Sequence, residues 1–99
     1  GKLHITAFNT GAVPTAVSAA GFVPLFAPAD ATGKYSYEME ILVRADSPIA
    51  DPKGLAKKRV GFVALSSNSG AKAPLVLLSE KFELMPAREY SFGFTGDHV

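Results

Sequence analysis

A run of small polar residues, Ser66–Gly70 (SSNSG), is the part of the sequence whose residue types could do chemistry. It follows the apolar run Val60–Leu65 and precedes a helical pattern, so it should form the start of a helix. Unpaired backbone N–H groups at a helix start carry partial positive charge, and the Ser and Asn side chains add neutral donors. The turn could therefore bind an oxyanion, with Gly70 letting the ion approach the backbone closely. Helix capping is the alternative, and the residue types alone favour it.

Two other side chains could serve the same chemistry. His98 follows the last predicted strand in a glycine-containing loop, and in a parallel sheet that loop lies on the same side as the Ser66–Gly70 turn. A histidine there could donate to an anionic oxygen, and would do so better when protonated. Tyr37, near the start of the longest strand pattern, could supply a hydroxyl and an apolar wall. An exposed loop histidine and a packed strand aromatic are the alternatives.

The sequence contains no motif that indicates another class of functional site. The nucleophile-elbow pattern G-x-S-x-G and the phosphate-loop pattern G-x-x-x-x-G-K-[ST] are both absent. Cysteine is absent too, and the carboxylates and histidines do not fall at metal-ligand spacing. The net charge is +1, and the basic stretch 53–59 is expected to be a solvated face without a nucleic-acid-binding motif. We expect no catalytic residue, metal, cofactor or nucleic-acid partner.

The elements that must position these residues alternate between strands and helices. Apolar or alternating runs predict strands at residues 3–8, 22–26, 35–44, 60–65 and 90–94. Strands interleaved with helices predict an α/β fold with a mainly parallel sheet and flanking helices. The continuous apolar run Val60–Leu65 further predicts a strand that is covered on both faces.

Helix signals surround these strands. A helix is predicted over residues 12–20, with Thr10 as its N-cap and Gly21 ending it. A second helix should end near Lys81, and Pro74 predicts that its regular part begins near Ala73 after a looser turn. Prolines and a glycine within residues 47–58 predict a loop with a short helical turn near Leu55.

Four segments in series resemble one family, the phosphonate-binding solute receptors of ABC importers, some of which are described for phosphate or phosphite. They are YEMEILVRADS at 37–47, VGFV at 60–63, SNSGAKAP at 67–74 and FTGDH at 94–98. The resemblance covers nearly the whole chain, in order and at suitable spacing. Asn68 stands where the family pattern usually has threonine, and Val99 stands where an acidic residue usually follows the histidine.

The resemblance implies a fragment of a two-lobed receptor of the type II periplasmic fold, about three times longer than this chain. Residues 1–46 would be the end of lobe one with the hinge strand, and residues 47–99 the start of lobe two. An abrupt start in a strand pattern and an abrupt end at residue 99 also suggest a fragment.

For the site, the resemblance implies that Ser67, Asn68 and Ser69 donate to the oxygens of a phosphonate, phosphate or phosphite. His98 would be a further donor, and Tyr37 a pocket wall and hydroxyl donor. The implied partner is an ABC permease in the membrane, and the implied location is periplasmic or extracytoplasmic, with lipid anchoring left open. A ligand-sensing domain of a signalling protein is one alternative, and a hydrolase using Ser67 or Ser69 with His98 as base is another.

Overall fold

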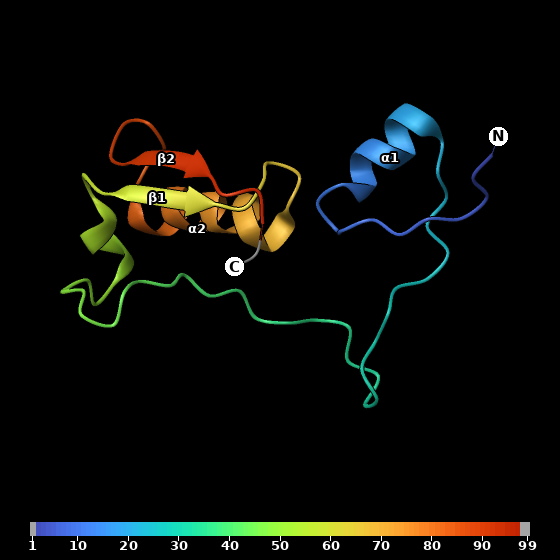
Figure 1. Ribbon diagram of the computed structural model, residues 1–99, viewed down its shortest axis with the longest axis horizontal. Helices are drawn as coiled ribbons and strands as arrows, with labels where there is room; N and C mark the ends of the chain where they lie inside the picture. Colours follow the sequence, from blue (N-terminus) through green and yellow to red (C-terminus); the bar gives the residue numbers. More distant parts are fainter. Residues whose placement is uncertain (1, 98–99) are drawn as a thin grey trace.

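A computed structural model of the chain describes residues 2–97, whose centre is a small α/β unit formed by the second half of the sequence. The elements in chain order are α1 (Val13–Ala20), the 3-10 helix η1 (Pro52–Leu55), β1 (Arg59–Phe62), the π-helix η2 (Asn68–Lys72), α2 (Ala73–Phe82) and β2 (Ser91–Phe94). β1 and β2 form a parallel sheet, α2 lies against one face of it, and α1 lies to one side (Figure 1). The expected α/β class with parallel strands is confirmed for these residues.

The sheet and α2 enclose the core. Its buried residues come from η1, β1, η2, α2 and the segment before β2, and they are Leu55, Phe62, Ala71, Leu78, Leu84 and Tyr90. Leu78 on α2 is completely buried, and burial of such a side chain contributes roughly 1.5–3 kcal/mol. β1 and β2 are joined through α2, as a parallel pair requires, and Phe62 pairs with Phe94 in the register.

The start of the second helix is a π-helical turn that leads into regular α-helix. The Lys72 N–H donates to the Ser67 carbonyl, which gives the longer five-residue spacing. Pro74 has no N–H to offer the Gly70 carbonyl, and that oxygen instead accepts from the Val63 N–H at 2.8 Å. The expected looser turn before Ala73 is confirmed, and it fastens the end of β1 to the helix.

The first helix, α1, begins one residue later than expected and is capped differently. Its N-cap is Ala12, so the predicted Thr10 cap is wrong; the Asn9 side chain accepts from the Ala12 N–H at 3.0 Å. Gly21 ends α1 as expected, in the left-handed conformation at φ 69°, where a Cβ would be strained. No helix among residues 2–97 is long and apolar enough to cross a membrane.

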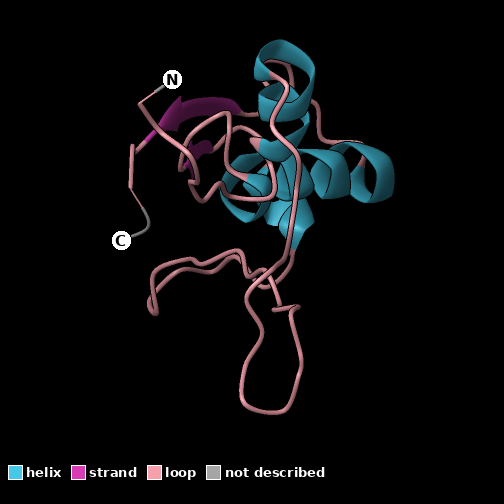
Figure 2. Ribbon diagram, turned by 90° about the vertical axis from the view of Figure 1, so that its right-hand side faces the viewer, coloured by secondary structure: helices cyan, strands magenta, loops and turns pink. Residues whose placement is uncertain are grey.

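Three predicted strands are wrong for the described chain, because the segments 3–8, 22–26 and 35–44 are loops (Figure 2). A strand needs a neighbour to pair its backbone groups, and residues 2–97 supply none for these segments. Their apolar side chains are left exposed: Ile5 is 62%, Val23 74% and Leu42 79% exposed. The alternation of apolar and polar residues indicates a preference for a half-buried strand. It does not provide the neighbouring strand that such a segment must pair with.

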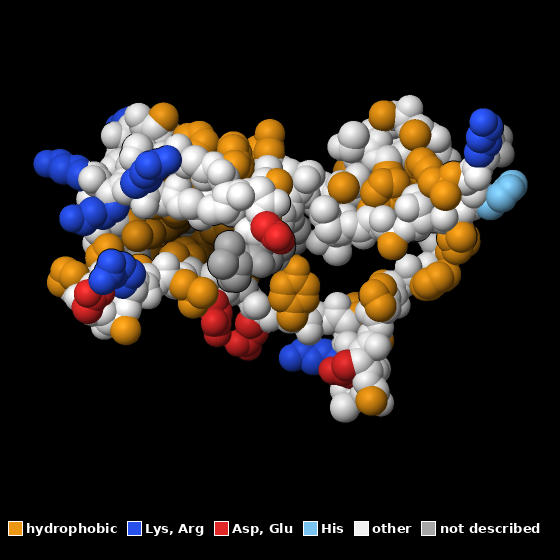
Figure 3. Space-filling view, viewed as in Figure 1, with side chains coloured by type: hydrophobic (Ala, Val, Ile, Leu, Met, Phe, Trp, Pro, Cys, Tyr) orange, Lys and Arg blue, Asp and Glu red, His pale blue; other side chains and the backbone are white. Residues whose placement is uncertain are grey.

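The strand predicted over 60–65 is shorter than expected and is not covered on both faces. β1 ends at Phe62 because the Val63 N–H turns to the Gly70 carbonyl. Phe62 is buried while Arg59 and Gly61 are exposed, so only one face of β1 is covered among the described residues. The short turn near Leu55 is confirmed as η1, and the basic side chains of residues 53–59 are exposed at the end of the unit away from α1 (Figure 3).

Candidate functional site

The Ser66–Gly70 turn lies at the carboxyl end of β1, where a cleft of about 890 Å³ opens. One wall is the segment 37–49, and the other is made by β1, η2 and α2. Much of the lining is apolar, and includes Ile41, Phe62 and Leu78. At the strand ends the lining becomes polar, with side chains from three separate segments: Tyr37, Ser69, Thr95 and Asp97.

Ser67 is the N-cap of η2 and is nearly buried, at 7% exposure. Its Oγ accepts from the Gly70 N–H at 3.1 Å, which satisfies one of the helix's unpaired donors. Capping is therefore what Ser67 does in the structure. The hydroxyl proton is not used by this bond, so the expected donation by Ser67 to a ligand stays a prediction.

Gly70 is half-buried, and protein atoms fill the space where a side chain would begin. A Cβ at this position would lie 2.5 and 2.6 Å from Val63 side-chain atoms and 2.9 Å from Ser67 Oγ. The glycine therefore lets η2 approach the end of β1. The structure thus shows a packing role for Gly70, and the expectation that this glycine lets an oxyanion approach the backbone stays a prediction.

Ser69 and Tyr37 meet across 32 positions of sequence. The Tyr37 hydroxyl donates to Ser69 Oγ at 2.9 Å, although the Tyr37 side chain is otherwise exposed. Since Tyr37 supplies the proton of this bond, the Ser69 hydroxyl proton remains available to another acceptor. The backbone N–H groups of Asn68 and Ser69 also have no acceptor within residues 2–97. Two donors, the Ser69 hydroxyl and the Ser69 N–H, thus lie at one end of the cleft, and the Asn68 N–H precedes them in the same turn.

The Asn68 side chain is exposed at the first position of η2, where it forms no hydrogen bond within residues 2–97. His98 lies outside the described residues. The loop that leads to it is anchored beside the turn, because the Gly96 N–H donates to the Val63 carbonyl at 2.8 Å. Gly96 has φ +86°, a conformation that favours glycine.

Two residues at this place were missed by sequence reasoning, Gly11 and Lys72. Gly11 is buried against the Ser66–Gly70 turn, and the Lys72 Nζ donates to the Gly11 carbonyl. A glycine in a polar loop is a weak signal of close backbone approach. Nothing in the sequence separates Lys72 from a solvent-exposed helix lysine.

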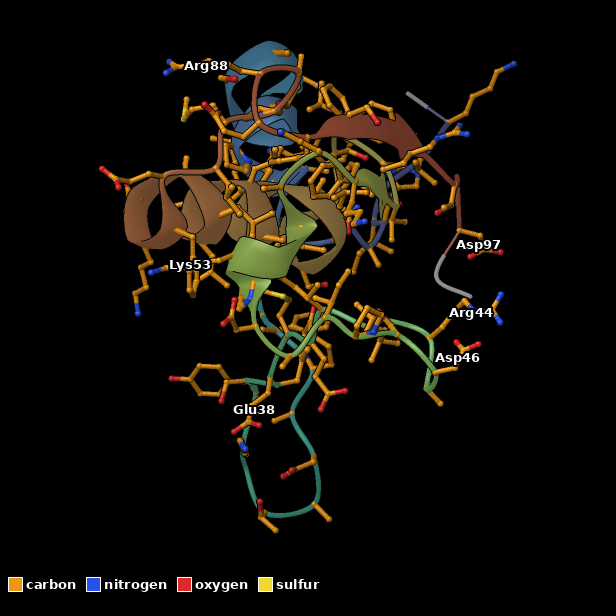
Figure 4. All side chains as sticks on the ribbon, turned by 90° about the vertical axis from the view of Figure 1, so that its left-hand side faces the viewer. Glu38, Arg44, Asp46, Lys53, Arg88 and Asp97 are labelled. Atoms are coloured by element: carbon orange, nitrogen blue, oxygen red, sulfur yellow. The ribbon has the colours of Figure 1, made fainter. Side chains whose placement is uncertain are left out.

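Charged groups of both signs line the cleft. Arg44 and Asp46 lie together at the turn that ends the segment 35–44 (Figure 4), with Arg44 nitrogens 3.0 and 2.9 Å from the two Asp46 oxygens. The hydrogen bond from Arg44 lowers the pKa of Asp46. No group of three metal-ligating side chains occurs among residues 2–97. The donors at Ser69 and Tyr37 are neutral hydroxyl and amide groups, which can donate hydrogen bonds to an anion with several oxygens.

Comparison with known proteins identifies the family. Residues 1–99 match the family described as "ABC transporter, phosphonate, periplasmic substrate-binding protein", so the chain belongs to that family. Comparison with curated proteins gave no significant match, and neither did comparison with solved structures. The family is one of substrate-binding components, which implies a small-molecule ligand, a membrane permease as partner and an extracytoplasmic location.

Proposed function

We propose that the protein is the solute receptor of an ABC importer for a tetrahedral phosphorus oxyanion, namely a phosphonate, phosphate or phosphite. The oxyanion accepts hydrogen bonds from the Ser69 hydroxyl, the backbone N–H groups of Asn68 and Ser69, and the Tyr37 hydroxyl. The Asn68 side chain, Ser67 and His98 complete the donor set expected from the family. The protein binds its ligand and carries out no reaction on it.

The observation that carries this proposal is the meeting of Tyr37 with Ser69. A tyrosine from the first half of the chain reaches the helix start where the family resemblance puts the anion. The Tyr37 hydroxyl donates to Ser69 and can turn to donate to a ligand instead. The partial positive charge of the helix start adds to the attraction for an anion.

The same contact supports the proposed division into lobes. Tyr37 lies in residues 1–46, the proposed end of lobe one with the hinge segment, and Ser69 lies in residues 47–99, the proposed start of lobe two. A ligand held between them would be enclosed when the lobes of a type II periplasmic receptor close. Closure excludes water, which strengthens each hydrogen bond to the ion. The closed receptor would then deliver its ligand to the permease.

A hydrolase at this place has less support. Ser67 Oγ accepts from the Gly70 N–H and Ser69 Oγ accepts from the Tyr37 hydroxyl, and the expected base of a hydrolase, His98, lies outside the described residues, so no observation favours that alternative. A serine nucleophile needs a base within hydrogen-bond reach.

The test is calorimetry on the complete protein that contains this chain, with phosphate, phosphite and methylphosphonate as ligands. At least one of them should bind. Ser69→Ala should weaken that binding by about 1–3 kcal/mol, because a donor to a charged group is lost. Tyr37→Phe should weaken it in the same direction without changing the far-UV circular dichroism spectrum.

Tyr35→Phe is the matched control for Tyr37→Phe. Tyr35 lies two residues away on the same segment, its side chain is 79% exposed, and its hydroxyl has no partner within residues 2–97. Its loss should leave the dissociation constant unchanged. Failure of all three oxyanions to bind at millimolar concentration would overturn the proposed function, and equal effects of the two tyrosine variants would remove Tyr37 from the site.

A further inference from the structure

The loop Asn9–Ala12 lies directly against the Ser66–Gly70 turn, more than fifty positions away in sequence. Gly11 is buried, whereas residues 2–10 before it are exposed. A Cβ on Gly11 would lie 2.2 Å from the Ser66 carbonyl oxygen and 2.8 Å from the Asn68 nitrogen. Only glycine allows this contact between two backbones, since both distances are shorter than real Cβ contacts.

Lys72 stabilises this contact between Gly11 and the Ser66–Gly70 turn by a hydrogen bond. Its ammonium, carried on η2, donates to the Gly11 carbonyl across 61 positions of sequence. Within residues 2–97 the Lys72 ammonium forms no salt bridge with a carboxylate, and it donates to the Gly11 carbonyl instead. A hydrogen bond from a charged donor is roughly twice as strong as one between neutral groups.

The fastened loop adjoins the candidate donors. Lys72 belongs to the same π-helical turn as Asn68 and Ser69, whose N–H groups lack acceptors in residues 2–97. The loop meets that turn at Ser66 and Asn68, and Tyr37 meets it at Ser69. Two separate segments of the first half of the chain therefore hold the turn.

We propose that Lys72 is a positioning residue for oxyanion capture, which holds the loop Asn9–Ala12 against the Ser66–Gly70 turn and so keeps the N–H groups of Asn68 and Ser69 in the direction that binding requires. This inference rests on the proposed function. Lys72 acts through the Gly11 carbonyl and need not touch the ion. Without the Lys72 bond the loop no longer holds the turn in place, the donors lose their fixed direction, and the ion dissociates faster.

The first experiment measures binding kinetics of methylphosphonate and phosphate on the complete protein. Lys72→Met keeps the apolar stem and removes the ammonium, and it should raise the dissociation rate constant roughly tenfold or more. Lys72→Arg restores a charged donor and should recover most of the wild-type rate. Lys81→Met is the matched control. Lys81 is exposed on the following helix α2, and its substitution removes the same charge.

The second experiment needs no ligand. Spin labels on Thr15→Cys in α1 and Glu80→Cys in α2 report how firmly the loop holds α1 to the helix; both sites are exposed and the chain has no native cysteine. The distance distribution should be narrow for the unaltered chain and for Lys72→Arg. It should broaden for Lys72→Met, and also for Gly11→Ala, whose Cβ pushes the loop off the turn.

Gly93→Ala is the control for Gly11→Ala, since the nearest atom that its Cβ would meet is Arg59 Nη2 at an ordinary 3.7 Å. Unchanged dissociation rate and unchanged distances in Lys72→Met would overturn the positioning role, as would an equal rate increase in Lys81→Met. Absence of oxyanion binding by the unaltered protein would instead overturn the proposed function and the role in capture with it. The two failures are distinguishable because the distance measurement is made without ligand.

Discussion

The substitution Gly70→Ala tests whether this glycine is needed for packing or for the approach of a ligand to the backbone. In the structure the added Cβ meets Val63 Cγ2 at 2.5 Å, Val63 Cβ at 2.6 Å and Ser67 Oγ at 2.9 Å. None of these contacts can be kept at those distances, so η2 must move away from the end of β1. The movement strains two hydrogen bonds, from the Gly70 N–H to Ser67 Oγ at 3.1 Å and from the Val63 N–H to the Gly70 carbonyl at 2.8 Å.

The expected loss of stability follows from these parts. Overpacking of a well-filled site costs about 1–3 kcal/mol. Weakening the cap and the strand-to-helix hydrogen bond adds about 1 kcal/mol for each bond that is broken. Because movement that relieves the overlap also lengthens the bonds, the costs are not independent, and we expect a total of about 2–4 kcal/mol.

Urea unfolding followed by far-UV circular dichroism measures this loss. Val63→Gly removes the two Val63 atoms that the new Cβ would meet and leaves only Ser67 Oγ, so the double variant should be less destabilised than the sum of the single variants. Gly93→Ala again serves as the control, because its Cβ would meet only Arg59 Nη2, at an ordinary 3.7 Å. A Gly70→Ala protein of unchanged stability and lost oxyanion binding would refute this reasoning, because it would place the glycine's role in ligand approach.

Two further predictions concern residues around this turn and in the core. Ser67→Ala should lower the unfolding free energy by about 1 kcal/mol in the same urea assay, since the Gly70 N–H loses its cap; no change would mean that water replaces the hydroxyl at no cost. Tyr90→Phe should raise the unfolding free energy at neutral pH by about 1 kcal/mol, because the Tyr90 hydroxyl is buried without a partner in residues 2–97. Burial also raises the pKa of the Tyr90 hydroxyl above its ordinary value of 10.0, so the unfolded chain ionises first and stability falls as pH rises beyond about 10. Tyr90→Phe should remove part of that alkaline decline, and a variant that is less stable than wild type at neutral pH would show that the hydroxyl has a partner.

Local signals in the sequence predicted several local features, although the predicted Thr10 cap was wrong. Gly21 ends α1, Pro74 separates the π-helical turn from regular helix, and Pro52 and Gly54 lie in the short helix η1. Each of these follows from one residue's own backbone chemistry, such as a missing N–H or a free φ angle. The predicted strands before residue 46 failed because a strand depends on a second segment, which alternation in one segment cannot specify.

The candidate site likewise combines features that local signals predict with contacts between distant residues that they do not. Its helix start was predictable because cap residues, a preceding apolar run and Pro74 are all local signals. The bond from Tyr37 to Ser69 was not predicted: each residue was expected to contact the ligand, and nothing in the sequence joins two residues 32 positions apart. The bond from Lys72 to Gly11 had no sequence signal, because a lysine stem can reach many acceptors and the choice is made by the fold.

Capping and anion binding, which looked like competing explanations of the Ser66–Gly70 turn, use different donors. Ser67 Oγ takes the Gly70 N–H, the third N–H of the helix, and leaves the N–H groups of Asn68 and Ser69 without acceptors in residues 2–97. A cap at that position fixes the direction of the two remaining groups. Ser67 should therefore affect both stability and affinity, whereas Ser69, whose Oγ lies at the polar end of the cleft, should affect affinity alone.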